Sequence, residues 1–434
     1  MAPLWFLAAL TLGAGLVHLY LWKRLVRDTT RPGTGRRLGS AALVLLGVAV
    51  PTTLIGTEAG LLWLTWPGYL WLALMFYLVL VLLALEAPVL AVRLLLRRRA
   101  RAATARPVPQ PAAVGNTATV ERPTAEAVAT IAPPEETVAP PAEGGAGASR
   151  VGPEHDPGRR LLLARGAAIV AGLTATGVTG YGVRVATGPP RLDRVRIPLA
   201  KLPRRMDGLR IATVSDIHLG PLNGRAHAER IVAAINRLDA DLVAVVGDLV
   251  DGTVEALGPA AAPLRGLRSR YGSFFVTGNH EYYSGAAEWI AEVDRLGLRV
   301  LQNERTGIVT PGGVLDLAGI NDLVATERGA PGPDFDAALG DRDTSRPVVL
   351  LAHQPVQVRE AARHGVDLQL SGHTHGGQFW PFDYVVRLEQ PVVSGLATID
   401  GTRLYVTNGA GFWGPPVRVG APPQVTLVEL RSTA

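Results

Sequence analysis

The stretch Ser371-Gly372-His373-Thr374-His375-Gly376-Gly377-Gln378 follows residues 366–370, in which apolar and polar side chains alternate as in a β-strand. Two histidines separated by one residue in a glycine-flanked turn can both point into one cavity, because glycine removes side-chain bulk and permits positive φ angles. This spacing is typical of metal ligands. A hydrogen-bonded polar pair at a strand end explains it equally well, so the stretch predicts a metal site only together with further ligands.

Four other apolar runs also end at residue types that bind metal ions. The polar residues at these four ends are Asp216 with His218, Asp248, Asn279 with His280, and His353. Short runs rich in β-branched and aromatic residues and bounded by Gly, Asp or Asn are typical of buried strands. Ligands of α/β proteins gather at the carboxyl ends of such strands. The five strand ends together therefore predict one shared metal site.

The order and spacing of these motifs resemble those of the calcineurin-like metallophosphoesterase superfamily. The motifs are Asp216-x-His218, Gly247-Asp248-x-x-Asp251, Gly278-Asn279-His280-Glu281, His353 and Gly372-His373-x-His375. The resemblance extends over residues 195–432. It implies an α/β metallophosphoesterase domain, residues 190–434, in which two packed mixed β-sheets are flanked by helices and the metal ions lie at the strand ends. Strand-like runs that alternate with amphipathic stretches, residues 226–238 and 286–296, independently favour α/β layering.

The resemblance also implies the ligands of two divalent metal ions. One ion would be held by Asp216, His218, Asp248 and His375, and the other by Asp248, Asn279, His353 and His373. Asp248 would bridge the two ions, and Gly247 before it would let the strand end turn. Imidazole, carboxylate and amide ligands suit Mn, Fe, Zn or Co better than Ca, and ligand softness does not choose among these four metals.

Further residues are predicted to act on the substrate. By the same resemblance, His280 would contact the phosphate or act as general acid, and Asp251 would orient its ring. A buried structural histidine is the alternative for His280. Asn279, His280 and Arg418 are the candidate contacts of the substrate; the bidentate guanidinium of Arg418 suits a phosphate. Two divalent ions about 3.5–4 Å apart would generate hydroxide near neutral pH and neutralise the charge that develops during hydrolysis.

The composition indicates that part of the chain lies in a membrane. Of its 434 residues 48% are hydrophobic, and apolar stretches of spanning length occupy residues 3–22, 38–55 and 66–92. Lys and Arg follow the first and third stretches. This pattern predicts three transmembrane helices within residues 1–100, with the N-terminus outside the cytoplasm. The chain has no Cys, which excludes disulfides and thiolate metal ligands.

Two segments connect this part to the catalytic domain. Residues 101–158 are rich in Ala, Pro, Thr, Glu and Gly without apolar periodicity, and they are predicted to be a disordered linker. In residues 159–186 the pair Arg159-Arg160 precedes an apolar stretch, which indicates either a fourth transmembrane segment or a twin-arginine-like export signal. Both possibilities place the catalytic domain outside the cytoplasm, in a multi-pass protein of the cell membrane. The basic residues that follow the segment, from Arg184 to Arg205, count against this orientation.

The sequence therefore favours a membrane-anchored, dinuclear metal-dependent phosphoesterase, most similar to bacterial membrane-associated phosphodiesterase-type members of the superfamily. Its location suggests a lipid-linked or cell-envelope phosphoester as substrate and the lipid bilayer as partner. A nucleotide or nucleic-acid phosphodiesterase is one alternative, supported only by the basic run of residues 184–210. Much of the net charge of +6 lies beside apolar segments, where Lys and Arg set membrane topology, so nucleic acid is disfavoured. A non-catalytic membrane scaffold with a structural metal site is the second alternative, although it would not need His280.

Overall fold

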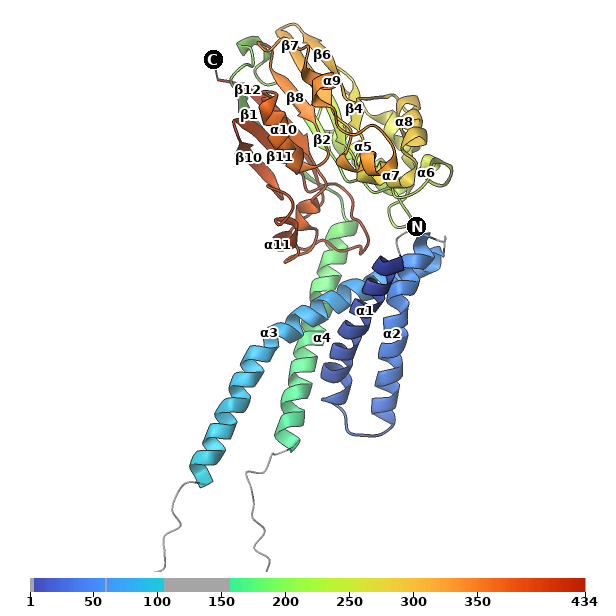
Figure 1. Cartoon of the computed structure of the whole chain (residues 1–434), viewed down its shortest axis with the longest axis vertical. Helices are drawn as coiled ribbons and strands as arrows, with labels where there is room; N and C mark the ends of the chain where they lie inside the picture. Colours follow the sequence, from blue (N-terminus) through green and yellow to red (C-terminus); the bar gives the residue numbers. More distant parts are fainter. Residues whose placement is uncertain (1–3, 59–60, 105–156, 434) are drawn as a thin grey trace, which may run out of the picture.

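The computed structural model describes residues 4–58, 61–104 and 157–433 as two regions, a group of long helices and an α/β domain (Figure 1). The helices end at Thr187, and the first strand of the α/β domain begins at Arg191. The predicted linker, residues 101–158, lies outside the described residues except at its two ends, which belong to helices.

The first region consists of four long helices. They are α1 (Leu4–Leu21), α2 (Thr34–Glu58), α3 (Thr65–Thr104) and α4 (Pro157–Thr187). Within the described residues, three stretches are long and apolar enough to cross a membrane, namely Thr34–Thr57, Leu62–Val92 and Arg160–Thr187. They contain the predicted spans 38–55 and 66–92 and all but the first residue of the predicted segment 159–186. The predicted span 3–22 coincides with α1, at the edge of the described chain, and is not among these three.

The helices alternate in direction relative to the α/β domain. Figure 1 shows α1 running away from the domain and α2 returning towards it, and likewise α3 running away and α4 returning. The connection between α1 and α2 therefore lies at the remote end, together with the end of α3 and the start of α4. Basic residues are concentrated at this remote end, in residues 23–37, 93–101 and 159–165.

The α/β domain is built on two six-stranded sheets. The first has the order β1-β12-β2-β3-β4-β5, with β1 (Arg191–Leu199), β12 (Gln424–Ser432), β2 (Arg210–Val214), β3 (Leu242–Val246), β4 (Ser273–Val276) and β5 (Leu298–Val300). The second has the order β10-β11-β9-β8-β7-β6, with β10 (Gly395–Ile399), β11 (Thr402–Val406), β9 (Leu368–Ser371), β8 (Val348–Leu351), β7 (Gly313–Gly319) and β6 (Glu304–Thr310). Each sheet contains both parallel and antiparallel pairs, so both sheets are mixed.

The core explains why the central strands read as continuous apolar runs. In β3, Leu242, Ala244 and Val246 pack towards the second sheet, whereas Val243 and Val245 pack towards helices on the opposite face. Both faces are thus buried, which favours β-branched and aliphatic residues at every position. The covering helices are α5 (Arg225–Asn236), α6 (Val254–Ala261) and α8 (Ala286–Arg295) on the first sheet, and α9 (Phe335–Leu339) and α10 (Val358–Arg363) on the second. The predicted fold, two packed mixed sheets flanked by helices after apolar N-terminal helices, is confirmed.

The two sheets meet at the strand ends that carry the motifs. The backbone N–H of His373, after β9, donates to both carboxylate oxygens of Asp216, after β2, over 3.0 and 3.1 Å. The backbone N–H of Gly372 donates to the carbonyl of His353, after β8. Because residues from both sheets bond here, the loops that follow these strands share one small space.

Candidate metal centre

The backbone bends sharply at most of the predicted ligands. Positive φ angles of 48–68° occur at Asp216, His218, Asp248, His373 and His375. This left-handed region costs a non-glycine residue about 1 kcal/mol or more and persists only where the surroundings enforce it. Gly247 also has positive φ, and a Cβ there would lie 2.6 Å from Nδ1 of His353. The strand ends are therefore folded so tightly that their side chains point inward.

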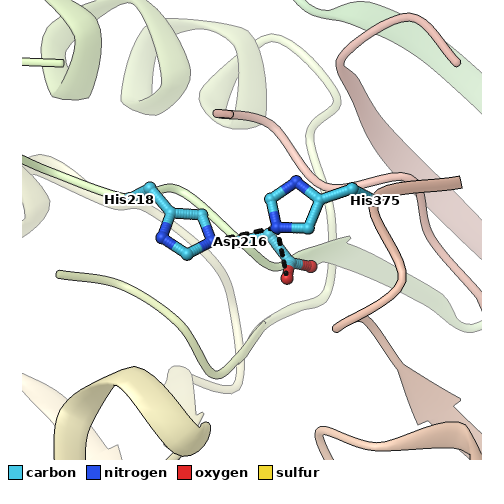
Figure 2. A group of neighbouring side chains, drawn as sticks. All are labelled: Asp216, His218 and His375. Atoms are coloured by element: carbon cyan, nitrogen blue, oxygen red, sulfur yellow. Dashed lines mark hydrogen bonds and ion pairs between the residues drawn. The ribbon is translucent and has the colours of Figure 1, made fainter. Parts of the chain in front are cut away.

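One cluster of three side chains joins the two sheets (Figure 2). His218 Nε2 lies 3.0 Å from His375 Nε2, and His375 Nε2 lies 3.4 Å from Asp216 Oδ1. Asp216 is fully buried and accepts a hydrogen bond from the hydroxyl of Ser215. Each residue offers one ligand atom, and these three atoms lie within 4.8 Å of one another. That spacing can hold one metal ion.

A second cluster lies beside the first. Asp248, His353 and His373 offer ligand atoms that again lie within 4.8 Å of one another. Asn279 joins them, because its Oδ1 lies 3.0 Å from His373 Nδ1. Nδ1 of His353 lies 2.8 Å from the carbonyl oxygen of Val246, a contact that directs Nε2 towards the cluster. The structure thus places the predicted ligands of the second ion together as well.

Asp248 faces both clusters. Its Oδ1 accepts the backbone N–H of His280 over 2.9 Å. Its Oδ2 lies 3.1 Å from His353 Nε2 and 3.9 Å from His218 Nε2. One oxygen is therefore fixed by the backbone and the other lies between the two groups, which is the placement that a bridging carboxylate requires.

Three features of these side chains fit bound cations. His353 Nε2 is buried and has no hydrogen-bond partner among the described residues, although it lies close to Asp248. Burial raises the pKa of Asp216, so a positive partner is needed to keep this carboxylate charged. Burial also lowers the pKa of His373 to about 3, with the charge of His353 adding to the effect, and this favours the neutral imidazole that binds metals.

His280 and Asp251 form a pair at the edge of the clusters. His280 Nδ1 lies 2.8 Å from Asp251 Oδ1, and the same oxygen lies 2.8 Å from His218 Nδ1. Burial alone would lower the pKa of His280, but the charges of Asp248 and Asp251 outweigh it and raise the pKa to about 9. The sequence predicted that Asp251 orients His280, and it did not indicate the second contact with His218. The atoms of Asp251, His218 and His280 are themselves close enough to form a third group of possible ligands.

Glu281 has a structural role that the sequence reasoning missed. Its buried carboxylate accepts the backbone N–H groups of Gly278, Asp248 and Leu249 over 2.6, 3.0 and 2.8 Å. Burial, with the charge of Asp248 adding to it, raises the pKa of Glu281 to about 7. A glutamate at the third position of helix α7 (Asn279–Ser284) is a capping-box signal, and this signal could have indicated the contact.

Arg418 does not lie where the substrate prediction requires it. Its side chain is 0% exposed, so it cannot contact a phosphate in the site. Its guanidinium donates to the backbone carbonyls of Gly411, His375, Asn408 and Ala421. It also donates to His375 Nδ1 over 3.1 Å. Burying a guanidinium requires that its N–H groups find acceptors, and the surrounding turns supply them. Arg418 therefore fixes the position of His375.

Comparisons with known proteins identify the family of the α/β domain. The sequence pattern of the family described as Calcineurin-like phosphoesterase matches residues 209–377. A transmembrane protein with metallophosphoesterase domain from Danio rerio is 40% identical over 260 residues, which cover 58% of this chain and 60% of that protein. A metallophosphoesterase of Helicobacter pylori is 39% identical over 243 residues, 56% of this chain and 64% of that protein. Relatives thus occur in animals as well as in bacteria.

A shorter relative establishes the family. A metallophosphoesterase of Aquifex aeolicus is 34% identical over 244 residues, which cover 56% of this chain and 92% of that protein. This chain belongs to the calcineurin-like metallophosphoesterase family. It spans less than two thirds of the length of the relatives from Danio rerio and Helicobacter pylori. The family is metal-dependent, and three apolar helices together with a relative named as a transmembrane protein support association with a membrane.

Proposed function

We propose that this chain is a membrane-anchored hydrolase that cleaves phosphoesters with two divalent metal ions. The observation that carries this proposal is the placement of Asp248, which belongs to the group with His353 and His373 and whose Oδ2 also lies 3.9 Å from His218 Nε2 of the other group. Asp216, His218, Asp248 and His375 would hold one ion, and Asp248, Asn279, His353 and His373 the other. Bound Mn, Fe, Zn or Co would supply activated water and charge neutralisation at the phosphate.

The remaining residues supply proton transfer and orientation. His280 is the proposed general acid, because Asp251 lies against its Nδ1 and its Nε2 lies 4.0 Å from Asp248 Oδ2, at the edge of the ligand groups. Asp251 holds Nδ1 and thereby directs Nε2 towards the leaving-group oxygen. Asn279 and His280 are the proposed contacts of the phosphate.

A phosphodiester of a lipid or of the cell envelope is the proposed substrate. The arrangement of the helices supports a catalytic domain outside the cytoplasm, because the basic runs 23–37, 93–101 and 159–165 lie at the end of the helices remote from this domain, although the run 184–210 lies on the domain side. Nucleic acid is less compatible with the structure. Several basic side chains of residues 184–210 already pair with carboxylates, among them Arg191 with Asp193 over 2.7 Å and Arg210 with Asp239 over 3.3 Å.

Metal-dependent turnover by the full chain tests the proposal. The chain in detergent is stripped with a chelator, resupplied with Mn, Zn, Fe or Co, and assayed on a chromogenic phosphodiester and the matching monoester. We expect turnover that depends on the metal and favours the diester. Asp248→Asn should lower it by a factor of about 1,000 or more, because the bridging charge is lost.

The matched control is Asp336→Asn on α9. The side chain of Asp336 is 91% exposed, so this substitution should leave turnover unchanged. If the metal-loaded native chain turned over neither ester, the scaffold alternative would be favoured. Equal rates for Asp248→Asn and the native chain would rule out the bridging role.

A further inference from the structure

A short segment beside the metal centre exposes large apolar side chains. This apolar segment, residues 380–388, follows the turn that carries His375 and contains the helix α11 (Asp383–Val386). Its exposed members, with 41–86% of their surface accessible, are Trp380, Phe382, Tyr384, Val385 and Leu388. Soluble proteins rarely expose so many large apolar side chains together, and such patches mark contacts with a protein or a membrane.

The apolar segment rests on a helix that is itself apolar enough to cross a membrane. The ring of Phe379 packs edge-to-face on Phe76 with centroids 5.1 Å apart, and the hydroxyl of Tyr77 donates to the carbonyl of Trp380 over 3.2 Å. Phe76 and Tyr77 belong to the stretch Leu62–Val92. Figure 1 shows α11 close to the upper part of α4 and above α3.

The length of that stretch leaves part of it outside the hydrocarbon core. Its 31 residues are longer than the ~20 residues, ~30 Å, that cross the core of a bilayer. The excess lies towards the α/β domain, where Trp66, Tyr69 and Trp71 carry the aromatic rings typical of a membrane interface. Phe76 and Tyr77, which contact residues 379 and 380, follow Trp71 by five and six residues and so lie within two helical turns of it.

A second loop links the apolar segment, α4 and the catalytic histidine. The backbone N–H of Arg418 donates to the carbonyl of Gly182 on α4 over 3.0 Å. The side chain of Gln378 bonds to the carbonyl and the N–H of Trp413, over 2.9 and 3.1 Å. Trp413 is exposed, and its ring centroid lies 5.7 Å from that of His280. One face of the domain thus carries both the contacts with α3 and α4 and an exposed tryptophan beside His280.

We infer that the apolar segment inserts into the lipid interface beside α3 and α4, so that the metal centre takes phosphoesters presented in the membrane plane. The occupant of this surface is the bilayer that the helices cross. Continuity with those helices carries the inference, and the mixture of exposed Trp, Tyr and Leu side chains suits a phospholipid interface. The substrate half of the inference rests on the proposed phosphoesterase function, whereas the docking half does not.

Lipid contact can be measured without activity. Because the chain has no Cys, Leu388→Cys gives a single labelling site on the apolar segment. The matched control is Val309→Cys on β6, which is 71% exposed and lies outside the apolar segment. Each full chain carries an environment-sensitive dye and is reconstituted in vesicles of phosphatidylcholine and phosphatidylglycerol. Spin-labelled lipid should quench the dye at position 388 at least about threefold more than the dye at position 309.

Two outcomes of this measurement would overturn the docking. Equal quenching at the two positions would show that the apolar segment stays in water. A dye at position 388 that is shielded from both the spin-labelled lipid and an aqueous quencher would indicate a protein, such as a second copy of this chain, as the occupant.

Turnover tests the substrate half. The double variant Val385→Glu and Leu388→Glu is compared with Val309→Glu in vesicles that contain a fluorogenic phosphodiester lipid, with a soluble chromogenic phosphodiester as reference. We expect the ratio of lipid to soluble turnover to fall about tenfold in the double variant only. The substrate half would be overturned if the native chain hydrolysed the soluble ester but not the lipid ester. It would also be overturned if the double variant left the ratio of lipid to soluble turnover unchanged. No turnover of either ester, with lipid quenching retained, would instead reject the proposed function and leave the docking intact.

Discussion

The active site has two sides that differ in origin. On one side, strand ends from both sheets fix buried Asp and His side chains through tight turns and short hydrogen bonds. On the other, residues 378–388 and 411–419 rest on α3 and α4 and expose apolar side chains. From this comparison we expect the sheets to determine the chemistry and the loops on the helices to determine how substrate reaches it. The two sides should therefore respond differently to substitution.

The largest effect is expected on the side built from the sheets. Asp251→Asn keeps the size of the side chain and removes the charge that lies 2.8 Å from both His218 and His280. We expect kcat on a soluble phosphodiester to fall about a thousandfold, because proton transfer by His280 loses its orienting partner. The measurement is kcat and KM with metal content determined on the same sample. A fall in metal content that accounts for the whole loss would instead assign Asp251 to holding His218.

The sheet side could be predicted because its signals are local. Each motif directly follows an apolar run, and strands of this kind end at a common edge, so the convergence of Asp216, Asp248, His353 and His373 follows from the pattern alone. The contacts of Glu281 required the helix boundary at Asn279, which the sequence suggests only weakly.

The helix side could not be predicted in the same way. An arginine near a glycine-rich stretch resembles a phosphate ligand, and only the tertiary structure shows that Arg418 is enclosed by carbonyl oxygens. Likewise Phe379 and Trp380 are neighbours in sequence, yet one packs on α3 and the other is exposed. Both outcomes depend on where distant segments lie, and no local pattern encodes that.

The second prediction concerns pH and the metal-free chain. The pKa of His280 rises from 6.5 to about 9 on folding, despite burial, because Asp248 and Asp251 are close; this corresponds to about 3 kcal/mol of stability. A raised histidine pKa stabilises the fold fully below pH 6.5 and less as the pH rises through 9. We expect the melting temperature of the chelator-treated chain to fall between pH 6.5 and 9.

The variant His280→Gln provides the control for this dependence, since its side chain does not titrate. Its melting temperature should change less over that window than that of the native chain. Glu281, whose pKa is raised from 4.5 to about 7, also makes the fold less stable as the pH rises, but mainly below pH 7. Because both chains contain Glu281, its contribution cancels when their melting temperatures are compared. Parallel curves for the two chains would contradict the assigned pKa of His280.

Arg418 contacts both sides of the site, His375 through its side chain and α4 through its backbone N–H. Its substitution should therefore have an effect of intermediate size. Arg418→Met keeps much of the apolar volume but removes the donors that fix His375 Nδ1 and four backbone carbonyls. We expect the affinity for the metal to weaken about thirtyfold, as for other residues that orient a ligand from behind. Chelator competition measures this, and Arg387→Met on the apolar segment is the exposed control. An unchanged affinity would mean that the turn alone positions His375.

The smallest effect is expected on the helix side, where a single hydrogen bond can be removed. Tyr77→Phe deletes the donor to the carbonyl of Trp380 and retains the ring, which should cost about 1 kcal/mol of unfolding free energy. Turnover of a soluble phosphodiester should stay within about twofold, because no group of the metal centre moves. Phe76→Ala, which removes the ring that packs on Phe379, is the stronger companion and should loosen the apolar segment further. If Tyr77→Phe lowered soluble turnover as much as Asp251→Asn, the helices would be part of the chemistry, and the division between the two sides would fail.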